Sequence, residues 1–107
     1  GNVSKQYFGR NGSAQTFAKG MECYWEAQKY WTEDLAPYEW AMLQKNKAEL
    51  RLLLLEISDW DDSAFQQAWS EIHDSLRYRT VDQSPYQFYR SDDVRKRLEA
   101  ARARNES

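Results

Sequence analysis

The two side chains best suited to hold a transition metal each occur once in this chain, as His73 and Cys23. A zinc or copper site needs more imidazole or thiolate ligands than one histidine and one distant cysteine, so we predict no metal site. His73 projects to the edge of an apolar helical stripe, beside Trp69, which is typical of a structural or surface histidine. Cys23 projects to the polar side of another helix without a neighbouring base, so we interpret it as a surface thiol rather than a nucleophile.

An acidic turn at Asp59, Asp61 and Asp62 superficially resembles a calcium loop. Such a loop needs Gly at its sixth position and Glu at its twelfth, where this chain has Ala64 and Ser70. We therefore expect these acids to cap a helix. No pair of carboxylates is singled out as an acid and base, and no glycine-rich turn follows a strand to hold phosphate. The sequence predicts neither an enzyme nor a cofactor.

A basic and aromatic segment, residues 77–104, is the part of the chain best able to bind a polyanion. Arginine makes bidentate contacts to phosphate, and tyrosine stacks on bases. The candidate residues are Arg77, Arg79, Arg90, Arg95, Arg97, Tyr86 and Tyr89. Several acids in the same segment dilute the positive charge, and the isoelectric point near 5.4 is unlike that of a typical nucleic-acid binder. The alternative, that these arginines pair with acids of the preceding helices, is favoured.

Four consecutive leucines, residues 52–55, lie inside a long helical pattern that spans residues 37–58. Because a helix turns by about 100° per residue, four neighbours cannot all face one core. Projection gives two apolar stripes. The main one, predicted to face the core, holds Met42, Leu43, Leu50, Leu53, Leu54 and Ile57. The second, with the spacing of a coiled-coil seam interrupted by Lys45, holds Ala41, Ala48, Leu52 and Leu55.

The second stripe has two interpretations. It is either the seam of a homodimer or the surface against which the C-terminal segment packs. Trp40, on the flank of this helix, and Trp60, in the following turn, are further candidates for partner binding, because tryptophan is common at the centre of interfaces.

The composition favours an all-α fold. The 107 residues suit a single domain, and all four glycines fall in the first 20 residues, so the turns that an all-β protein needs are missing from the rest. We expect residues 1–12 to form a flexible lead-in and residues 13–107 to form one helical domain. No apolar run is long enough to span a membrane, and the single cysteine and absence of an export signal favour the cytoplasm.

Helical patterns cover residues 13–31, 37–58 and 62–78, joined by short connections that favour antiparallel neighbours. The first pattern carries an apolar stripe that includes Met21, Trp25 and Trp31. Residues 80–90 show no helical period and are predicted to form an ordered connection anchored by aromatic side chains. A weaker helix is expected from Ser91, with fraying over its end from Arg102 to Ser107. The predicted architecture is a small antiparallel bundle of three main helices plus this C-terminal helix.

These patterns favour a non-enzymatic protein-binding module, an adaptor, regulator or assembly factor, that associates with itself through the helix at residues 38–58. The alternative hypothesis is a nucleic-acid-binding regulator that uses residues 77–104. A protein partner or a second copy is expected in the first case. No membrane is expected in either case.

Overall fold

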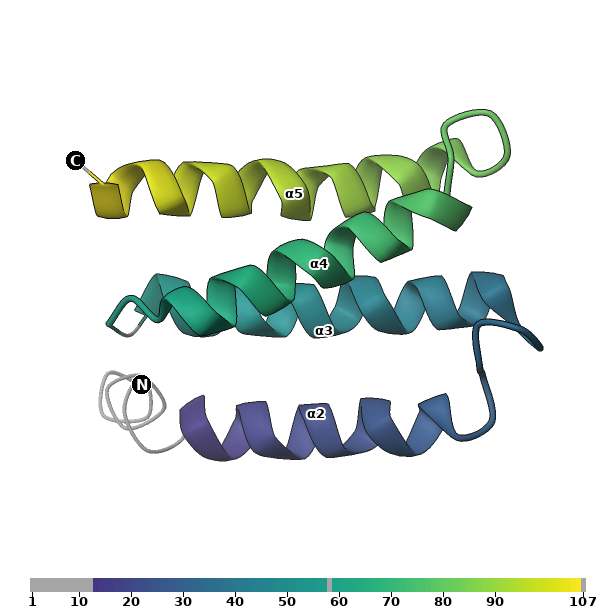
Figure 1. Cartoon of the computed structure of the whole chain (residues 1–107), viewed down its shortest axis with the longest axis horizontal. Helices are drawn as coiled ribbons and strands as arrows, with labels where there is room; N and C mark the ends of the chain where they lie inside the picture. Colours follow the sequence, from purple (N-terminus) through teal and green to yellow (C-terminus); the bar gives the residue numbers. More distant parts are fainter. Residues whose placement is uncertain (1–12, 58, 107) are drawn as a thin grey trace, which may run out of the picture.

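Four α-helices make up most of the structure, a computed structural model that describes residues 13–57 and 59–106. They are α2 (Ser13–Gln28), α3 (Pro37–Ile57), α4 (Asp62–Tyr78) and α5 (Pro85–Glu106). Figure 1 shows successive helices running in opposite directions along the bundle. The predicted all-α fold is therefore confirmed. The predicted lead-in, residues 1–12, lies outside the described residues.

The ends of the first three helices follow local capping chemistry. α4 begins directly after Asp61, whose Oδ1 accepts a 3.1 Å hydrogen bond from the amide of Ala64, as the capping interpretation predicts. α3 begins at Pro37. The backbone N–H that proline lacks would have no acceptor within the first turn of the helix, so its absence costs no hydrogen bond. α2 ends at Gln28, earlier than the predicted residue 31, because the amide of Trp31 bonds back to the carbonyl of Ala27 in a closing turn.

α5 is longer than the sequence pattern predicts. It begins at Pro85, so Tyr86 and Tyr89 are helical, which corrects the expected aromatic connection. It continues to Glu106, so residues 102–106, at the end where fraying was expected, are helical. The helical period was hidden because Ser91 occupies a buried position while the two tyrosines face outward.

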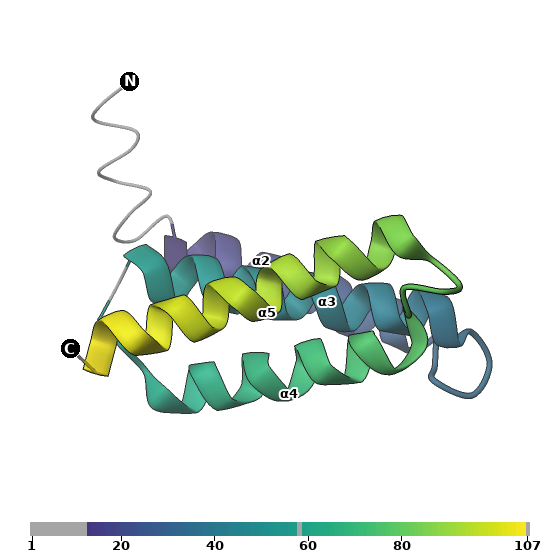
Figure 2. The same ribbon diagram turned by 90° about the horizontal axis from the view of Figure 1, so that it is seen from above.

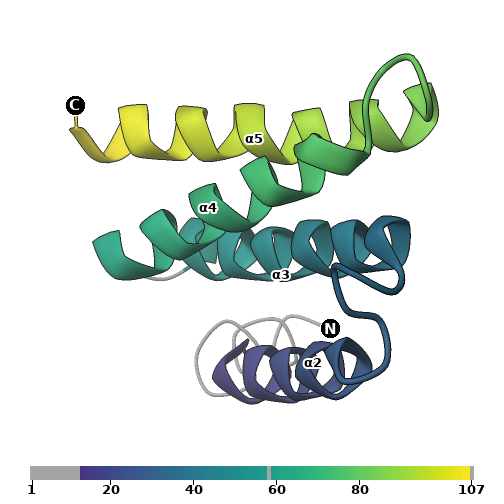
Figure 3. The same cartoon turned by 45° about the vertical axis from the view of Figure 1, so that its right-hand side comes forward.

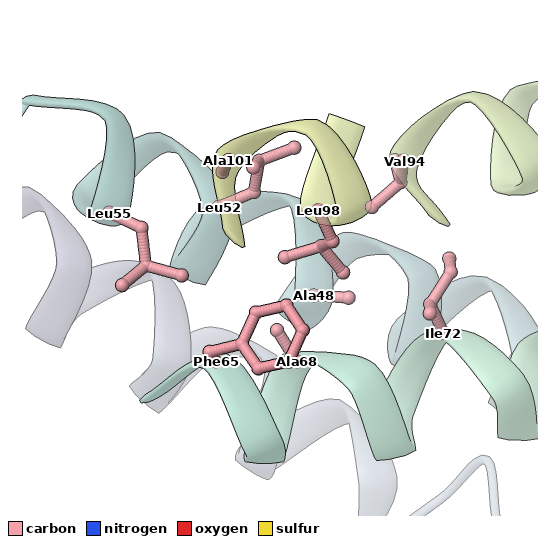
Figure 4. Packing of buried hydrophobic residues seen from close by; sticks show 9 residues of the cluster. All are labelled: Ala48, Leu52, Leu55, Phe65, Ala68, Ile72, Val94, Leu98 and Ala101. Carbon is pink, nitrogen blue, oxygen red and sulfur yellow. The ribbon is translucent and has the colours of Figure 1, made fainter. Parts of the chain in front are cut away.

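α3 is the central helix of the bundle. Figures 1 and 3 show α2 and α5 on opposite sides of α3, and Figure 2 shows α4 lying across the α3–α5 pair on one face. α4 packs against both α3 and α5, whereas α2 packs mainly against α3. The hydrophobic core accordingly fills the space between α3, α4 and α5 (Figure 4), and it consists of Ala48, Leu52, Leu55, Phe65, Ala68, Ile72, Val94, Leu98 and Ala101.

The second stripe of α3 lies in the core shared with α4 and α5, whereas the main stripe is buried only in part, with Leu43 2% exposed. Ala41, Ala48 and Leu52 are fully buried, and Leu55 nearly so, because the small alanines let α4 and α5 approach closely. In the stripe predicted to face the core, Leu53 and Ile57 are instead 45% and 47% exposed. The second interpretation, packing against the C-terminal segment, is therefore the one observed. The expected homodimer seam is corrected accordingly, since these four residues are covered within the chain.

Polar contacts add specificity to the packing. Arg51 on α3 makes a bidentate pair with Glu71 on α4, at 2.9 and 3.1 Å, and Lys47 lies 3.8 Å from the same carboxylate. Between α4 and α5, the buried hydroxyls of Ser75 and Ser91 are hydrogen-bonded at 3.2 Å. These pairs fix which helix faces meet.

α2 meets α3 through a narrow face. Met21 is buried against α3, and Gly20 allows a close approach, since a Cβ there would lie 2.6 Å from Cδ2 of Leu50. Trp25 and Trp31, predicted in the core-facing stripe, are 53% and 41% exposed. The reason for this difference is that, among the described residues, α2 packs mainly against α3, so it buries less of its circumference than a helix with two such neighbours would.

Candidate partner-binding surface

Most arginines of the predicted polyanion site are neutralised within the chain. Three of the five form ion pairs with carboxylates, but only two of them, Arg77 and Arg97, reach acids of the preceding helices as the favoured alternative predicted, whereas Arg95 pairs within α5. The pairs are Arg77 with Glu33 at 3.1 Å and Asp74 at 3.3 Å, Arg95 with Asp92 at 2.8 Å and Glu99 at 2.7 Å, and Arg97 with Glu56 at 2.8 Å. These guanidinium groups support the bundle and are poorly placed to bind phosphate.

Arg79 is also a structural residue. It is buried, and its Nη2 donates a 3.1 Å hydrogen bond to the backbone carbonyl of Tyr38, while Nη1 donates to the side chain of Gln87. Burial lowers the pKa of Arg79, and the carboxylate of Glu39 opposes that shift. Arg79 therefore ties the start of α3 to the first turn of α5.

The remaining predicted residues, Tyr86, Tyr89 and Arg90, lie together. They line a pocket of about 300 Å³ between α3 and α5, whose other lining residues are Glu49 and Asp93. The guanidinium carbon of Arg90 lies 5.7 Å from the centre of the Tyr86 ring, within the range of a cation–π contact. We call these five residues the α3–α5 surface. Tyr86 and Tyr89 are 68% and 63% exposed, so their rings are accessible.

The charges around the pocket are balanced in sign. Glu49 lies 3.6 Å from the ammonium nitrogen of Lys45, which is almost fully buried behind it. Burial lowers the pKa of Lys45, with Glu49 opposing the shift and Arg90 adding to it. Arg90 and Asp93 are exposed. Within the described residues, neither of them forms an ion pair.

The two tryptophans predicted to bind a partner are used largely inside the chain. Trp40 packs edge-on against Tyr78, with ring centres 5.8 Å apart, and Trp60 lies 5.4 Å from Phe65 at the border of the core. Both are half-buried. Trp60 also lines, with residues of α3 and α5, a second pocket of about 250 Å³. Both tryptophans are therefore less exposed to solvent than Tyr86 and Tyr89 of α5.

A third pocket, which is apolar and was not predicted from the sequence, lies at the end of α2. Ala27, Tyr30 and Trp31 line a pocket of about 300 Å³, and Leu35 nearby is almost fully exposed. The sequence pattern assigned Trp31 to the core because it continued the period of α2 beyond the true end of the helix. A helix predicted to end at Gln28 would have placed the side chain of Trp31 among the candidates for partner binding.

The residues weighed for metal or nucleophilic chemistry lie on the surface. Cys23 is exposed, and His73 is exposed with its ring 4.6 Å from that of Trp69, as predicted. Among residues 13–57 and 59–106, no three His, Cys, Asp or Glu side chains gather closely enough to hold a metal ion. None of the described helices combines the length and apolar character needed to cross a membrane.

Comparison with known protein families, curated proteins and solved structures gives no match for this chain. Inference about its function therefore depends on the surfaces described above.

Proposed function

We propose that this chain is a non-enzymatic protein-binding module, an adaptor, regulator or assembly factor of the cytoplasm, and that its partner docks on the α3–α5 surface. The observation that carries this proposal is the display of Tyr86, Tyr89 and Arg90 around one pocket. Tyrosine and arginine are among the residues that contribute most to binding energy in protein interfaces.

The shape and rigidity of the surface support the same proposal. All three residues stand on a regular helix, whose inner face is anchored by Val94 and Leu98, so a partner would meet side chains on a fixed scaffold. A tyrosine ring supplies apolar area on its faces and a hydrogen-bonding hydroxyl at its tip, which suits a contact that is exposed in the free protein. The pocket is large enough to receive a side chain of a partner.

The charges favour a protein over a nucleic acid. Glu49 and Asp93 line the same pocket as Arg90, and carboxylates repel phosphate. A polyanion would also have to compete with the intrachain ion pairs of Arg77, Arg95 and Arg97. A protein partner can instead match both signs of charge.

The test is affinity capture from an extract of the native host with the whole chain as bait. The double variant Tyr86→Ala, Tyr89→Ala removes both exposed rings. We expect it to capture at least about tenfold less of the specific partner than the wild type does. Tyr30→Ala is the matched control, because Tyr30 is 77% exposed but lies on α2. Circular dichroism of each variant establishes that the helices are intact.

Two outcomes would contradict the proposal. One is capture of the same proteins, in the same amounts, by the wild type and the double tyrosine variant. The other is retention of DNA or RNA that weakens steeply with salt, as counterion release requires, and that falls when Arg90 is replaced. The second result would support the nucleic-acid hypothesis.

A further inference from the structure

We infer that the partner that occupies the α3–α5 surface is a second copy of this chain, bound in a dimer with two-fold symmetry. This inference rests on the proposed function and names the partner for the same surface. It places self-association on α5, away from the buried residues of α3 that the sequence pattern suggested.

The first observation is the pairing of charges along α5. In the middle of α5, ion pairs join Asp92 to Arg95 and Lys96, Glu99 to Arg95, and Arg97 to Glu56. Arg90 and Asp93, which line the pocket, form no ion pair with any residue that the structure describes. The surface therefore presents one cation and one anion that no ion pair among the described residues engages.

The second observation is their spacing. Residues three apart on a helix are neighbours on one face, with Cβ atoms roughly 5–6 Å apart. A two-fold axis that passes between Arg90 and Asp93, perpendicular to α5, brings Arg90 of one copy to Asp93 of the other and repeats the contact in reverse. Such an interface is isologous, since one patch binds itself. A surface with equal and opposite charges is complementary to its own copy, whereas a surface with one sign of charge repels its copy.

The aromatic residues fit the same arrangement. Tyr86, Arg90, Asp93 and Arg97 follow one another at steps of four, three and four, so they share a face of α5. In the antiparallel pair just described, Tyr86 lies opposite Arg97 of the second copy, whose guanidinium can receive the ring beside its ion pair with Glu56. Tyr89, on the rim of the pocket, adds apolar area that each copy removes from water. The ion pairs set the register, and the tyrosine rings supply most of the buried area.

The experiment is charge reversal, read by sedimentation velocity over a wide range of protein concentration. Arg90→Glu and Asp93→Arg each replace attraction by repulsion twice in a symmetric dimer, so we expect each to weaken dimerisation by about tenfold or more. The exchanged double variant, Arg90→Asp with Asp93→Arg, restores both pairs and the dimer. An equimolar mixture of the two single variants forms a heterodimer more readily than either variant dimerises alone.

Glu106→Lys is the matched control, because Glu106 is exposed at the far end of the same helix. We expect it to dimerise like the wild type. Circular dichroism tests folding, and if a reversal perturbs the helices, the neutral variants Arg90→Gln and Asp93→Asn replace it, each with weaker dimerisation expected.

The inference is overturned if the wild type stays monomeric at every concentration, or if dimers form but the mixed single variants show no preference for each other. These failures are distinguishable from failure of the proposed function. A monomeric wild type that still captures a host protein, and loses it in the Tyr86→Ala, Tyr89→Ala variant, removes the dimer and keeps the protein-binding surface.

Discussion

Adjacent residues of α3 experience very different surroundings. Leu52 is fully buried among core residues of α4 and α5, whereas Leu53, the next residue, is 45% exposed on the other side of the helix. Removing part of a buried leucine leaves a cavity that the surrounding bundle fills only in part, and an exposed leucine leaves none. Because both residues are leucine, the same substitution at the two positions compares the effect of burial alone.

We expect Leu52→Ala to lower the free energy of unfolding by about 2–5 kcal/mol, as cavity formation in cores typically does. Leu53→Ala is expected to lower it by less than about 1 kcal/mol, because little apolar contact is lost there. Urea denaturation of both variants measures the difference. Equal losses at the two positions would contradict the burial described for α3.

The helices differ in how well their sequences predict them. α4 was predicted with the bounds it has, because its apolar residues recur at helical spacing and Asp61 caps its first turn. α5 was recognised only from residue 91, because a serine lies in its core face and tyrosines lie on its outer face. Periodicity finds a helix only where apolar residues mark the inside, and α5 breaks that rule at its start.

Only part of the candidate site could be predicted from the sequence. Tyr86, Tyr89 and Arg90 were identified from their residue types, but their convergence with Glu49 depends on how α5 packs on α3. The partners of the other arginines lie on several helices, so no local pattern reveals them. Choosing between the two stripes of α3 likewise required the positions of α4 and α5, because both stripes have helical spacing.

A polar link between α4 and α5 provides a test at the level of elements. Replacing either Ser75 or Ser91 by alanine leaves the other buried hydroxyl without its partner, so each single variant is expected to lose about 1–3 kcal/mol of stability. Replacing both serines removes the unsatisfied hydroxyl, so the double variant is expected to lose less stability than the two single variants lose together. A double-mutant cycle by thermal or urea denaturation measures this coupling, and strict additivity would argue against a hydrogen bond between the helices.

The molecule as a whole is unevenly built. α3, α4 and α5 share the core, whereas α2 packs mainly against α3 and contributes none of the residues of that cluster. Local stability follows the number of buried apolar contacts, so regions of one protein open with different free energies. The bundle is therefore a three-helix body with a fourth helix attached along one side.

Hydrogen exchange reads this difference directly. We expect the amides of α2 to exchange faster than those of the central turns of α3 and α4, because α2 separates from α3 without disrupting the core. Measurement of exchange by NMR or mass spectrometry at several denaturant concentrations distinguishes partial from global opening. Protection of α2 equal to that of α4 would mean that all four helices unfold as one unit.

The participation of α5 in the core has a consequence during synthesis. Leu98 and Ala101 close the cluster around Phe65 and Leu52, so the core stays open to water until residue 101 has left the ribosome. Before then, the faces of α3 and α4 that pack against α5 have no cover, and such surfaces favour association with other unfolded chains. The shortest growing chain able to hide its own leucines is therefore one that already includes the last turns of α5.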